Sequence, residues 1–306
     1  MYDIIYDVII IGSGPAGITA GIYAARRKMK TLIIGKQVGG QIIWASIIEN
    51  YPGFKSINSF ELIQKMEDQI KSLNVEIKTE EVKEIKKSNN NFLIITKKGN
   101  YKAKTIIIAT GLLPRCLDIP GEKELIGKGV SYCATCDGPL FKNKAVAVVG
   151  GGNAALDAAE VLSKIACQVY LIHRKEHFRG FETLVAKIQQ KDNIEIVFDS
   201  QVQEIIGQSK LEKIKIINNK TNKIREININ GLFIEIGRQA YTQIVADLVK
   251  LDSNKKIIID SNCRTNQSGI FAAGDVTQTS FNQIVIACGQ GSIAALSAYE
   301  FLQSQK

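Results

Sequence analysis

The stretch Gly12-Ser13-Gly14-Pro15-Ala16-Gly17 is a glycine-rich turn between two segments of different pattern. Residues 6–11 before the turn are almost all apolar and predict a strand buried in a parallel sheet. Residues 15–28 predict a helix, and residues 30–34 predict a second strand. In this setting the glycines let the backbone approach a pyrophosphate at the N-terminus of the helix. The stretch therefore predicts a dinucleotide-binding unit.

The same pattern returns in the middle of the chain. Residues 145–149 predict a strand, Gly150-x-Gly152-x-x-Ala155 a turn, residues 153–164 a helix and residues 168–172 the next strand. The nucleotide-binding fold is therefore expected twice. An acidic side chain commonly binds the ribose after the second strand of such a unit. The first unit has Gly35-Lys36 there, so its ribose contact has to come from elsewhere.

Basic residues follow the second strand of the second unit. The segment His173-Arg174-Lys175-Glu176-His177-Phe178-Arg179 places Arg174, Lys175 and Arg179 at the carboxyl end of that strand. Cations at this place favour the 2′-phosphate of NADP, whereas an acid would favour the free hydroxyl of NAD. The alternative is an exposed basic loop without a ligand. We expect the NADP site.

Two cysteines, in Cys133-Ala134-Thr135-Cys136, precede the second glycine turn, and Asp137 follows them. In CxxC motifs one thiolate attacks a disulfide and the second thiol resolves the mixed disulfide. Half of a zinc site is the alternative, but zinc needs four ligands and the chain has no second CxxC. The two histidines, His173 and His177, lie far along the chain. We expect a redox dithiol and no metal, with Asp137 as a proton donor and acceptor or as a turn residue.

The bulk composition is that of a folded protein with two domains. The chain has 306 residues, of which 45% are hydrophobic and 23% charged. We expect no membrane span, no secretion signal and a place in the cytoplasm, because no run of 18 apolar residues and no basic leader occurs. The isolated cysteines do not form the pattern of a secreted disulfide framework; they are Cys116, Cys167, Cys263 and Cys288.

The net charge of +9 leaves two interpretations open. Lysines are scattered along the chain with few aromatic residues among them, which argues against nucleic-acid binding. The positive charge is therefore either solvated or attracts an acidic protein partner.

Further elements are expected between and after the two glycine turns. Residues 60–73 predict a helix, residues 75–105 a small β excursion with a turn at 88–91, residues 105–109 a buried strand, and residues 231–236 and 269–273 later strands.

These motifs, with several others, resemble those of the low-molecular-weight thioredoxin reductases of bacteria and archaea over essentially the whole chain. The segments that match, in chain order, are GSGPAG (12–17), GGQ (39–41), ENYPG (49–53), ATG (109–111), YCATCDG (132–138), GGGNAALDAAE (150–160), HRKxxxR (173–179), FAAGDV (271–276) and residues 282–295. The resemblance implies a homodimeric flavoenzyme that passes electrons from NADPH through FAD and the dithiol to thioredoxin. It also implies a rotation between two domains.

The resemblance implies an α/β fold with two Rossmann-like dinucleotide-binding domains, one inserted in the other. Residues 1–113 and 245–306 would form the FAD-binding domain, and residues 114–244 the NADP-binding domain with the CxxC. In this family the first cysteine, here Cys133, attacks thioredoxin, and the second, here Cys136, faces the flavin. Asp137 would protonate or deprotonate the thiol.

Cofactor contacts are implied at matching positions. For FAD they are Gly12, Ser13, Gly14, Pro15, Ala16, Gly17, Gly39, Gly40, Gln41, Asn50, Val82, Ala109, Thr110, Gly111, Gly274, Asp275, Gln283 and Ile284. For NADPH they are Gly150, Gly152, Asn153, Ala154, Ala155, His173, Arg174, Lys175, Arg179 and Gly237.

Three positions depart from the family pattern. Lys175 replaces an arginine, Asn282 replaces the arginine before Gln283, and residues 237–240 lack the usual Pro-Asn. Larger disulfide reductases carry a CxxxxC in the FAD domain. They are excluded because the corresponding region here, Gly39-Gly40-Gln41, has no cysteine. Two alternatives stay open: a ferredoxin-driven flavin thioredoxin reductase, which lacks the NADPH motifs, and a non-catalytic redox-sensing flavoprotein.

Overall fold

The computed structural model describes residues 4–44, 47–88 and 91–305 and divides the chain into two compact units. The first unit is Met1–Leu113 with Gln239–Lys306, and the second is Pro114–Arg238. Strands β9 (Leu112–Pro114) and β18 (Arg238–Ala240) join the units and pair with each other. The second unit is thus inserted in the first.

The second boundary differs from the sequence-based one. The sequence placed the return to the first unit at residue 245, whereas the structure returns at Gln239. The reason is local packing: the backbone oxygen of Tyr241 accepts a hydrogen bond from Thr110 Oγ1 (2.8 Å), and Ile244 is buried in a core cluster of the first unit.

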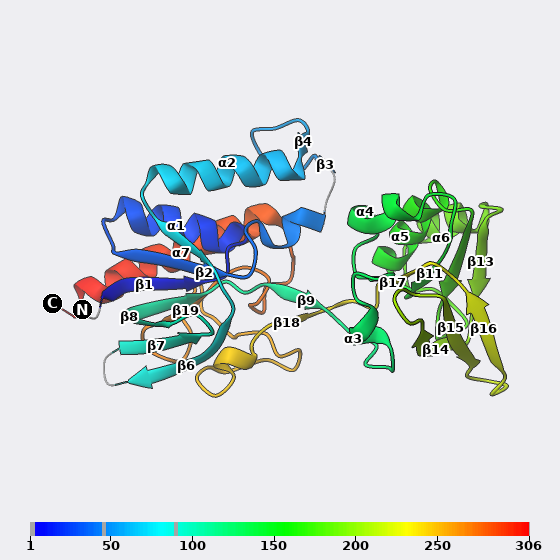
Figure 1. Cartoon of the computed structure of the whole chain (residues 1–306). Helices are drawn as coiled ribbons and strands as arrows, with labels where there is room; N and C mark the ends of the chain where they lie inside the picture. The colour runs from blue at the N-terminus through cyan, green and yellow to red at the C-terminus, as the bar shows by residue number, and fades with distance from the viewer. Residues whose placement is uncertain (1–3, 45–46, 89–90, 306) are drawn as a thin grey trace. The chain divides into compact units, whose positions relative to one another are not determined.

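A seven-stranded sheet organises the first unit, in the order β5-β2-β1-β8-β7-β6 with β19 beside β8 (Figure 1). Its strands are β1 (Ile5–Ile11), β2 (Thr31–Gly35), β5 (Glu76–Thr79), β6 (Val82–Ser88), β7 (Asn91–Thr96), β8 (Asn100–Ile108) and β19 (Ile270–Ala272). Strands β5, β2, β1, β8 and β19 are mutually parallel, and β6 and β7 are antiparallel. The remaining elements are α1 (Pro15–Arg26), η1 (Gly40–Trp44), β3 (Ile47–Ile48), β4 (Ile57–Asn58), α2 (Ser59–Ser72), η3 (Gln243–Val245) and α7 (Ile284–Gln303).

The expected excursion at residues 75–105 divides between two roles. Strand β5 joins the parallel sheet, and only β6, β7 and the start of β8 form the antiparallel excursion. The strand expected at 105–109 is the buried end of β8 and continues from it without a break. Of the turn expected at 88–91, residues 89–90 lie outside the described residues.

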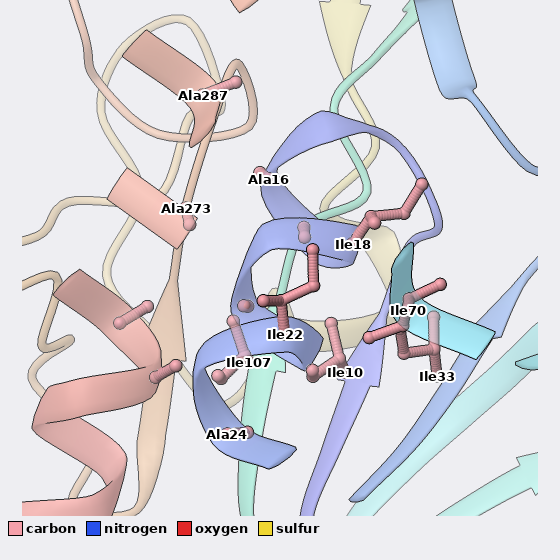
Figure 2. Packing of buried hydrophobic residues seen from close by; sticks show 14 of the residues in the cluster. Ile10, Ala16, Ile18, Ile22, Ala24, Ile33, Ile70, Ile107, Ala273 and Ala287 are labelled. Carbon is pink, nitrogen blue, oxygen red and sulfur yellow. The ribbon is translucent and has the colours of Figure 1, made fainter. Parts of the chain in front are cut away.

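Helix α7 was not expected from the sequence, because small residues dilute its apolar pattern. Those small residues bring it close to α1: an ideal Cβ on Gly291 would lie 2.2 Å from the backbone oxygen of Ala16. By length and composition α7 is apolar enough to cross a membrane, a test that core helices also pass. Its alanines are buried in the cluster that Figure 2 shows around Ile18 and Ile22 of α1.

The second unit contains a five-stranded parallel sheet in the order β10-β17-β11-β12-β13. Its strands are β10 (Val130–Ser131), β17 (Gly231–Ile234), β11 (Ala145–Val149), β12 (Gln168–Ile172) and β13 (Ile194–Val197), and its helices are α3 (Glu122–Leu125), α4 (Ala134–Asp137), η2 (Gly138–Phe141), α5 (Asn153–Ser163) and α6 (Glu182–Gln189). An antiparallel sheet follows, with β14 (Ser200–Ile206), β15 (Lys213–Asn218) and β16 (Ile224–Asn228). Both units are therefore Rossmann-like α/β folds.

Candidate functional site

The first glycine turn lies between β1 and α1, where backbone atoms crowd it from two sides. Gly12 has a left-handed φ of +118°, and an ideal Cβ there would lie 2.1 Å from the backbone oxygen of Ala109. At Gly17 a Cβ would lie 1.9 Å from the backbone oxygen of Gly12. An ideal Cβ on Gly14, in contrast, would lie 3.6 Å from its nearest neighbour, the Cα of Gly40. No side chain among the described residues caps α1, so its first N–H groups remain for a phosphate.

The place of the missing ribose acid is filled by a serine. An ideal Cβ on Gly35 would lie 2.3 Å from Ser13 Oγ, which itself donates to the backbone oxygen of Gln37 (2.8 Å). No acidic side chain fits at position 35. The neighbouring Lys36 pairs with Glu81 at 2.8 Å.

Polar side chains from distant segments meet beside this turn in the first unit. Gln41 Nε2 donates to Asp275 Oδ2 (2.9 Å), and Asn50 Nδ2 donates to Gln283 Oε1 (3.1 Å). The backbone N–H of Gly39 donates to the oxygen of Ser13 (2.8 Å). The structure therefore brings together the segments that the sequence assigned to FAD, and their backbone donors, amides and open Gly14 fit a bound dinucleotide.

The other residues assigned to FAD are more deeply placed. Ala109 and Gly274 are buried, and Ile284 is the first residue of α7. Val82 is 4% exposed and belongs to the core, so only its backbone is available to a ligand. Gln290 was missed: its Oε1 accepts the N–H of Gly274 at 2.7 Å. Its signal is a polar residue within an otherwise apolar helix.

The second glycine turn, between β11 and α5, is more open. An ideal Cβ on Gly150 would lie 2.4 Å from the backbone oxygen of Glu235, whereas an ideal Cβ on Gly152 would meet none of the described residues beyond its chain neighbours and its own helix within 4 Å. Ala155 is fully buried, and Asn153 Oδ1 accepts the N–H of Phe181 (2.8 Å). Within the described residues α5 has no side-chain cap, and Ala154 is exposed in its first turn. This turn also fits a phosphate.

His173 lies beneath the second turn. It is 4% exposed, and an ideal Cβ on Gly151 would lie 2.2 Å from its ring. Burial, followed by the nearby Arg179 and other cations, lowers the pKa of His173, so the ring is neutral near pH 7. The sequence assigned His173 to NADPH binding. Its buried position beneath Gly151 indicates that it supports the turn by packing against it.

Three exposed cations surround this turn. Within the described residues Arg174, Lys175 and Arg179 make no ion pair. The N–H of Arg179 donates to the oxygen of Gly151 (2.7 Å), which fixes the segment beside the turn. The acid of the segment, Glu176, pairs instead with Lys220 (2.7 Å). The remaining positive charge suits a phosphate monoester. Gly237 lies at the end of the unit, exposed and with a left-handed φ of +101°.

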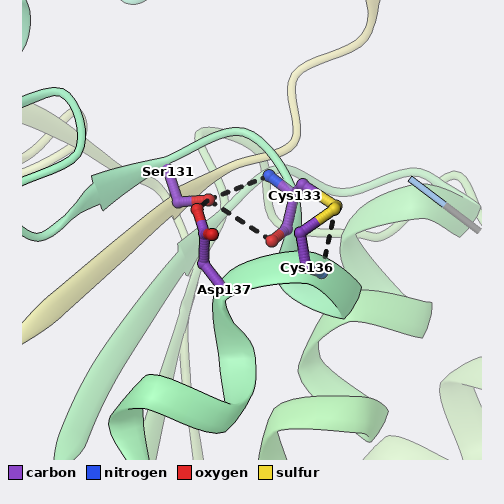
Figure 3. Close-up of a disulfide and its surroundings, with 4 residues drawn as sticks. All are labelled: Ser131, Cys133, Cys136 and Asp137. Carbon is purple, nitrogen blue, oxygen red and sulfur yellow. Dashed lines mark hydrogen bonds between the residues drawn. A yellow bond between two sulfur atoms is a disulfide. The ribbon is translucent and has the colours of Figure 1, made fainter. Parts of the chain in front are cut away.

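The two cysteines of the CxxC form a disulfide at the start of α4 (Figure 3). Cys133 is half-buried and Cys136 exposed, and the backbone N–H of Cys136 donates to Cys133 Sγ at 3.1 Å. Asp137 Oδ2 lies 2.6 Å from Ser131 Oγ. The sequence analysis missed Ser131, whose only signal is its place two residues before the motif.

A second carboxyl group lies beside the same helix. Glu235, which follows β17, accepts a hydrogen bond from the backbone N–H of Ala134, the first residue of α4. Burial raises the pKa of Glu235 to about 7, against the smaller opposing effect of Arg238. The other four cysteines are free, and the described part of the chain has no cluster of three metal-binding side chains.

Comparisons with known proteins agree with this arrangement. The family model described as pyridine nucleotide-disulphide oxidoreductase matches residues 6–291. The chain is 39% identical to a thioredoxin reductase of Treponema pallidum, with 98% of both chains covered. The structure is similar to that of Lactococcus lactis thioredoxin reductase, with a TM-score of 0.86, 41% identity, and 98% and 99% of the two chains covered. It is also similar to a ferredoxin-flavin thioredoxin reductase of Clostridium acetobutylicum, with a TM-score of 0.55, 32% identity, and 98% and 99% covered.

Proposed function

The chain belongs to the thioredoxin reductases of the pyridine nucleotide-disulphide oxidoreductase family, and we propose how its own residues divide the reaction. It is a flavoprotein disulfide oxidoreductase that uses NADPH and FAD to reduce the disulfide of thioredoxin. FAD, held by the first unit, would supply the transfer of an electron pair between the reduced nicotinamide and a disulfide. The proposal concerns which residues of this chain hold the cofactors and handle the thiols and protons.

The first unit holds FAD. The open Gly14 and the uncapped start of α1 receive the pyrophosphate. The hydrogen-bonded pairs Gln41–Asp275 and Asn50–Gln283 position the rest of the site. This assignment is supported by contacts of Gly39, Ala109 and Gly274 with the turn.

The second unit holds NADPH. Gly152 and the start of α5 receive its pyrophosphate, and Arg174, Lys175 and Arg179 bind the 2′-phosphate. The observation that carries the proposal is that these three cations make no ion pair with any residue that the structure describes. A ferredoxin-driven enzyme needs no such group beside a nucleotide turn.

The dithiol delivers the electrons. The Cys133 thiolate attacks the thioredoxin disulfide, which forms a mixed disulfide and releases one thioredoxin thiolate. The Cys136 thiolate then attacks Cys133 Sγ, so the Cys133–Cys136 disulfide is restored and thioredoxin leaves with both thiols reduced. The N–H that Cys136 donates to Cys133 Sγ stabilises the attacking thiolate. Asp137 supplies or takes up the proton.

Anaerobic titration of the yellow holoprotein tests the electron source. NADPH is expected to bleach the flavin at least tenfold faster than NADH at equal concentration. A factor of ten corresponds to the free energy of about one charge-assisted hydrogen bond to the 2′-phosphate, which NADH lacks. Reduced ferredoxin is the third arm. Bleaching by ferredoxin alone would assign the chain to the ferredoxin-driven class, and bleaching without thioredoxin turnover would favour a redox sensor.

Cysteine variants test the order of the thiols. Cys136→Ser is expected to trap a mixed disulfide with a thioredoxin that lacks its own resolving cysteine, because no thiol remains to displace it. Cys133→Ser, the matched control, is expected to trap nothing. The opposite pattern would reverse the two roles.

The proposal also covers the oligomeric state of the enzyme and its cellular compartment. The enzyme acts as a homodimer, as the family implies, and works in the cytoplasm without a membrane or nucleic-acid partner. The four free cysteines support a reducing compartment. Size-exclusion chromatography with light scattering tests the dimer.

A further inference from the structure

Ser131 occupies a fixed place beside the dithiol. It is the last residue of β10, pairs in register with Phe233 of β17, and is 5% exposed. Figure 3 shows its hydroxyl between Asp137 and the backbone of Cys133. A buried hydroxyl anchored to the sheet holds its position better than the short helix α4 that carries the cysteines.

The Ser131 hydroxyl has one proton to donate but two acceptors within reach. It accepts the N–H of Cys133 at 3.0 Å. Its single proton has two possible acceptors: Asp137 Oδ2 at 2.6 Å and the backbone oxygen of Cys133 at 3.3 Å. A carboxylate at the shorter distance is the stronger acceptor, so the proton goes to Asp137 while that group is ionised.

We propose that Ser131 is a positioning residue that couples the protonation of Asp137 to the backbone of Cys133. This inference rests on the proposed proton-transfer role of Asp137. When a thiol gives its proton to Asp137, the new carboxyl O–H donates to Ser131 Oγ, and the serine proton turns to the oxygen of Cys133. When Asp137 releases the proton, both hydrogen bonds return. The hydroxyl accepts the Cys133 N–H in both states. It donates to Asp137 when that group is ionised, and it accepts the Asp137 O–H and donates to the Cys133 oxygen when that group is protonated.

The same arrangement decides which carboxyl oxygen works. The thiol proton is exchanged at Oδ2, the carboxyl oxygen that Ser131 contacts. Without the hydroxyl, the carboxyl group loses the hydrogen bond that fixes it and can rotate, so it is no longer held for proton exchange with the thiol. Turnover then falls, and the pH dependence of the dithiol moves to higher pH.

Other ionisable groups share this corner and have to be separated from Asp137. Glu235 faces the start of α4, with Arg238 acting on it. Tyr132 donates to Glu122 Oε1 at 2.6 Å. On α5, which packs in the same core cluster as Ala134, the acids are Asp157 and Glu160. A comparison within the Asp137→Asn background removes their shared contribution.

Alkylation of the dithiothreitol-reduced holoprotein by iodoacetamide, followed against pH, is the direct test, since it needs neither NADPH nor thioredoxin. Ser131→Ala is expected to move the profile up by roughly 0.5–1 pH unit. It is also expected to lower thioredoxin turnover about tenfold, with the rate of flavin reduction by NADPH unchanged. Ser131→Thr, which keeps the hydroxyl, should restore both. The matched control is Ser200→Ala, another buried hydroxyl of the second unit.

In the Asp137→Asn background, Ser131→Ala is expected to have no further effect on the profile. An unmoved profile in Ser131→Ala, or an equal shift in both backgrounds, would overturn the proposal. If Ser131→Ala does not fold, Ser131→Thr becomes the test of the proposal. A folded Ser131→Thr variant with tenfold lower thioredoxin turnover would contradict the proposed role of the hydroxyl. Wild-type protein that is alkylated as expected yet does not reduce thioredoxin would refute the proposed function. The effect of Ser131→Ala on the alkylation profile could still be interpreted, because alkylation does not require thioredoxin.

Discussion

The two glycine turns have nearly the same sequence pattern but different surroundings. Both have a backbone oxygen close against the first glycine and space at the second. The first is more enclosed, because a backbone oxygen also lies against Gly17 and side chains from distant segments of the same unit are hydrogen-bonded to one another. The second has an open Gly152 and exposed cations without ion pairs among the described residues. The enclosed turn suits a cofactor that stays bound, and the open turn suits a nucleotide that is exchanged in each cycle. The pattern alone does not distinguish these roles; the residues around it do.

The largest expected effect comes from closing the first turn. In Gly17→Ala, the new Cβ would meet the backbone oxygen of Gly12 at 1.9 Å, and backbone on both sides cannot yield. We expect FAD binding to weaken more than about 100-fold, which is about 3 kcal/mol. The flavin absorbance per protein after gel filtration measures it.

The control for this variant is Gly289→Ala, a helix glycine with no atom within 4 Å of an ideal Cβ. It should keep full flavin content. A yellow, stable Gly17→Ala protein would mean that the first turn is not the rigid site we describe.

The next largest effect concerns the charge of the second turn. Arg174→Ala removes a charge-assisted hydrogen bond to the 2′-phosphate, about 1.5–3 kcal/mol. KM for NADPH should therefore rise about tenfold or more, while KM for NADH and the flavin content stay constant. Lys210→Ala, an exposed cation elsewhere in the unit, should change neither. Equal increases for both nucleotides would show that Arg174 does not read the 2′-phosphate.

A smaller effect is expected from the support beneath the second turn. In Gly151→Ala, the new methyl group meets the His173 ring at 2.2 Å, and the turn has to shift. KM for NADPH should rise about tenfold, or 1.4 kcal/mol, with FAD retained. Adding His173→Ala removes the obstacle and should recover most of the loss. No recovery in the double variant would mean that another contact limits the turn.

Sequence reasoning and structure diverge in a consistent way. The apolar runs and glycines predicted β1, β11, β12 and the turns after them, because these features are local. Helix α7 was not predicted, because its close packing on α1 requires small residues, and these weaken the apolar pattern in the sequence.

Contacts between distant residues were beyond the local pattern. Nothing near Ser131, Gln290 or Glu235 in the sequence says which group each will face. The pairing of Gln41 with Asp275 was likewise out of reach of periodicity, and only the resemblance to a family pointed to both residues. The return to the first unit at Gln239 depends on how Tyr241 packs, which sequence alone does not give.

The last predicted effect is on stability and not on ligand binding: the two units differ in their response to pH. Burial raises the pKa of Glu235 in the second unit from 4.5 to about 7. Between these values the folded protein binds more protons than the unfolded chain, so the free energy of unfolding falls as pH rises from 4.5 to 7. Glu235→Gln should remove this loss and stabilise the protein at pH 8 by roughly 1–2 kcal/mol, after allowance for partial exposure.

Glu81 in the first unit provides the opposite case. Hydrogen bonds from Lys36 and Lys83 lower its pKa to about 2, so the stability it contributes is present above pH 4.5 and is lost as pH falls towards 2. Glu81→Gln should therefore slightly destabilise the protein at neutral pH, where Glu235→Gln stabilises it. Urea unfolding of both variants and the wild type between pH 2 and 8 measures the two slopes. Slopes of the same sign would contradict the assignment, because a carboxyl whose burial outweighs its one neighbouring cation and a carboxyl between two cations must respond oppositely to pH.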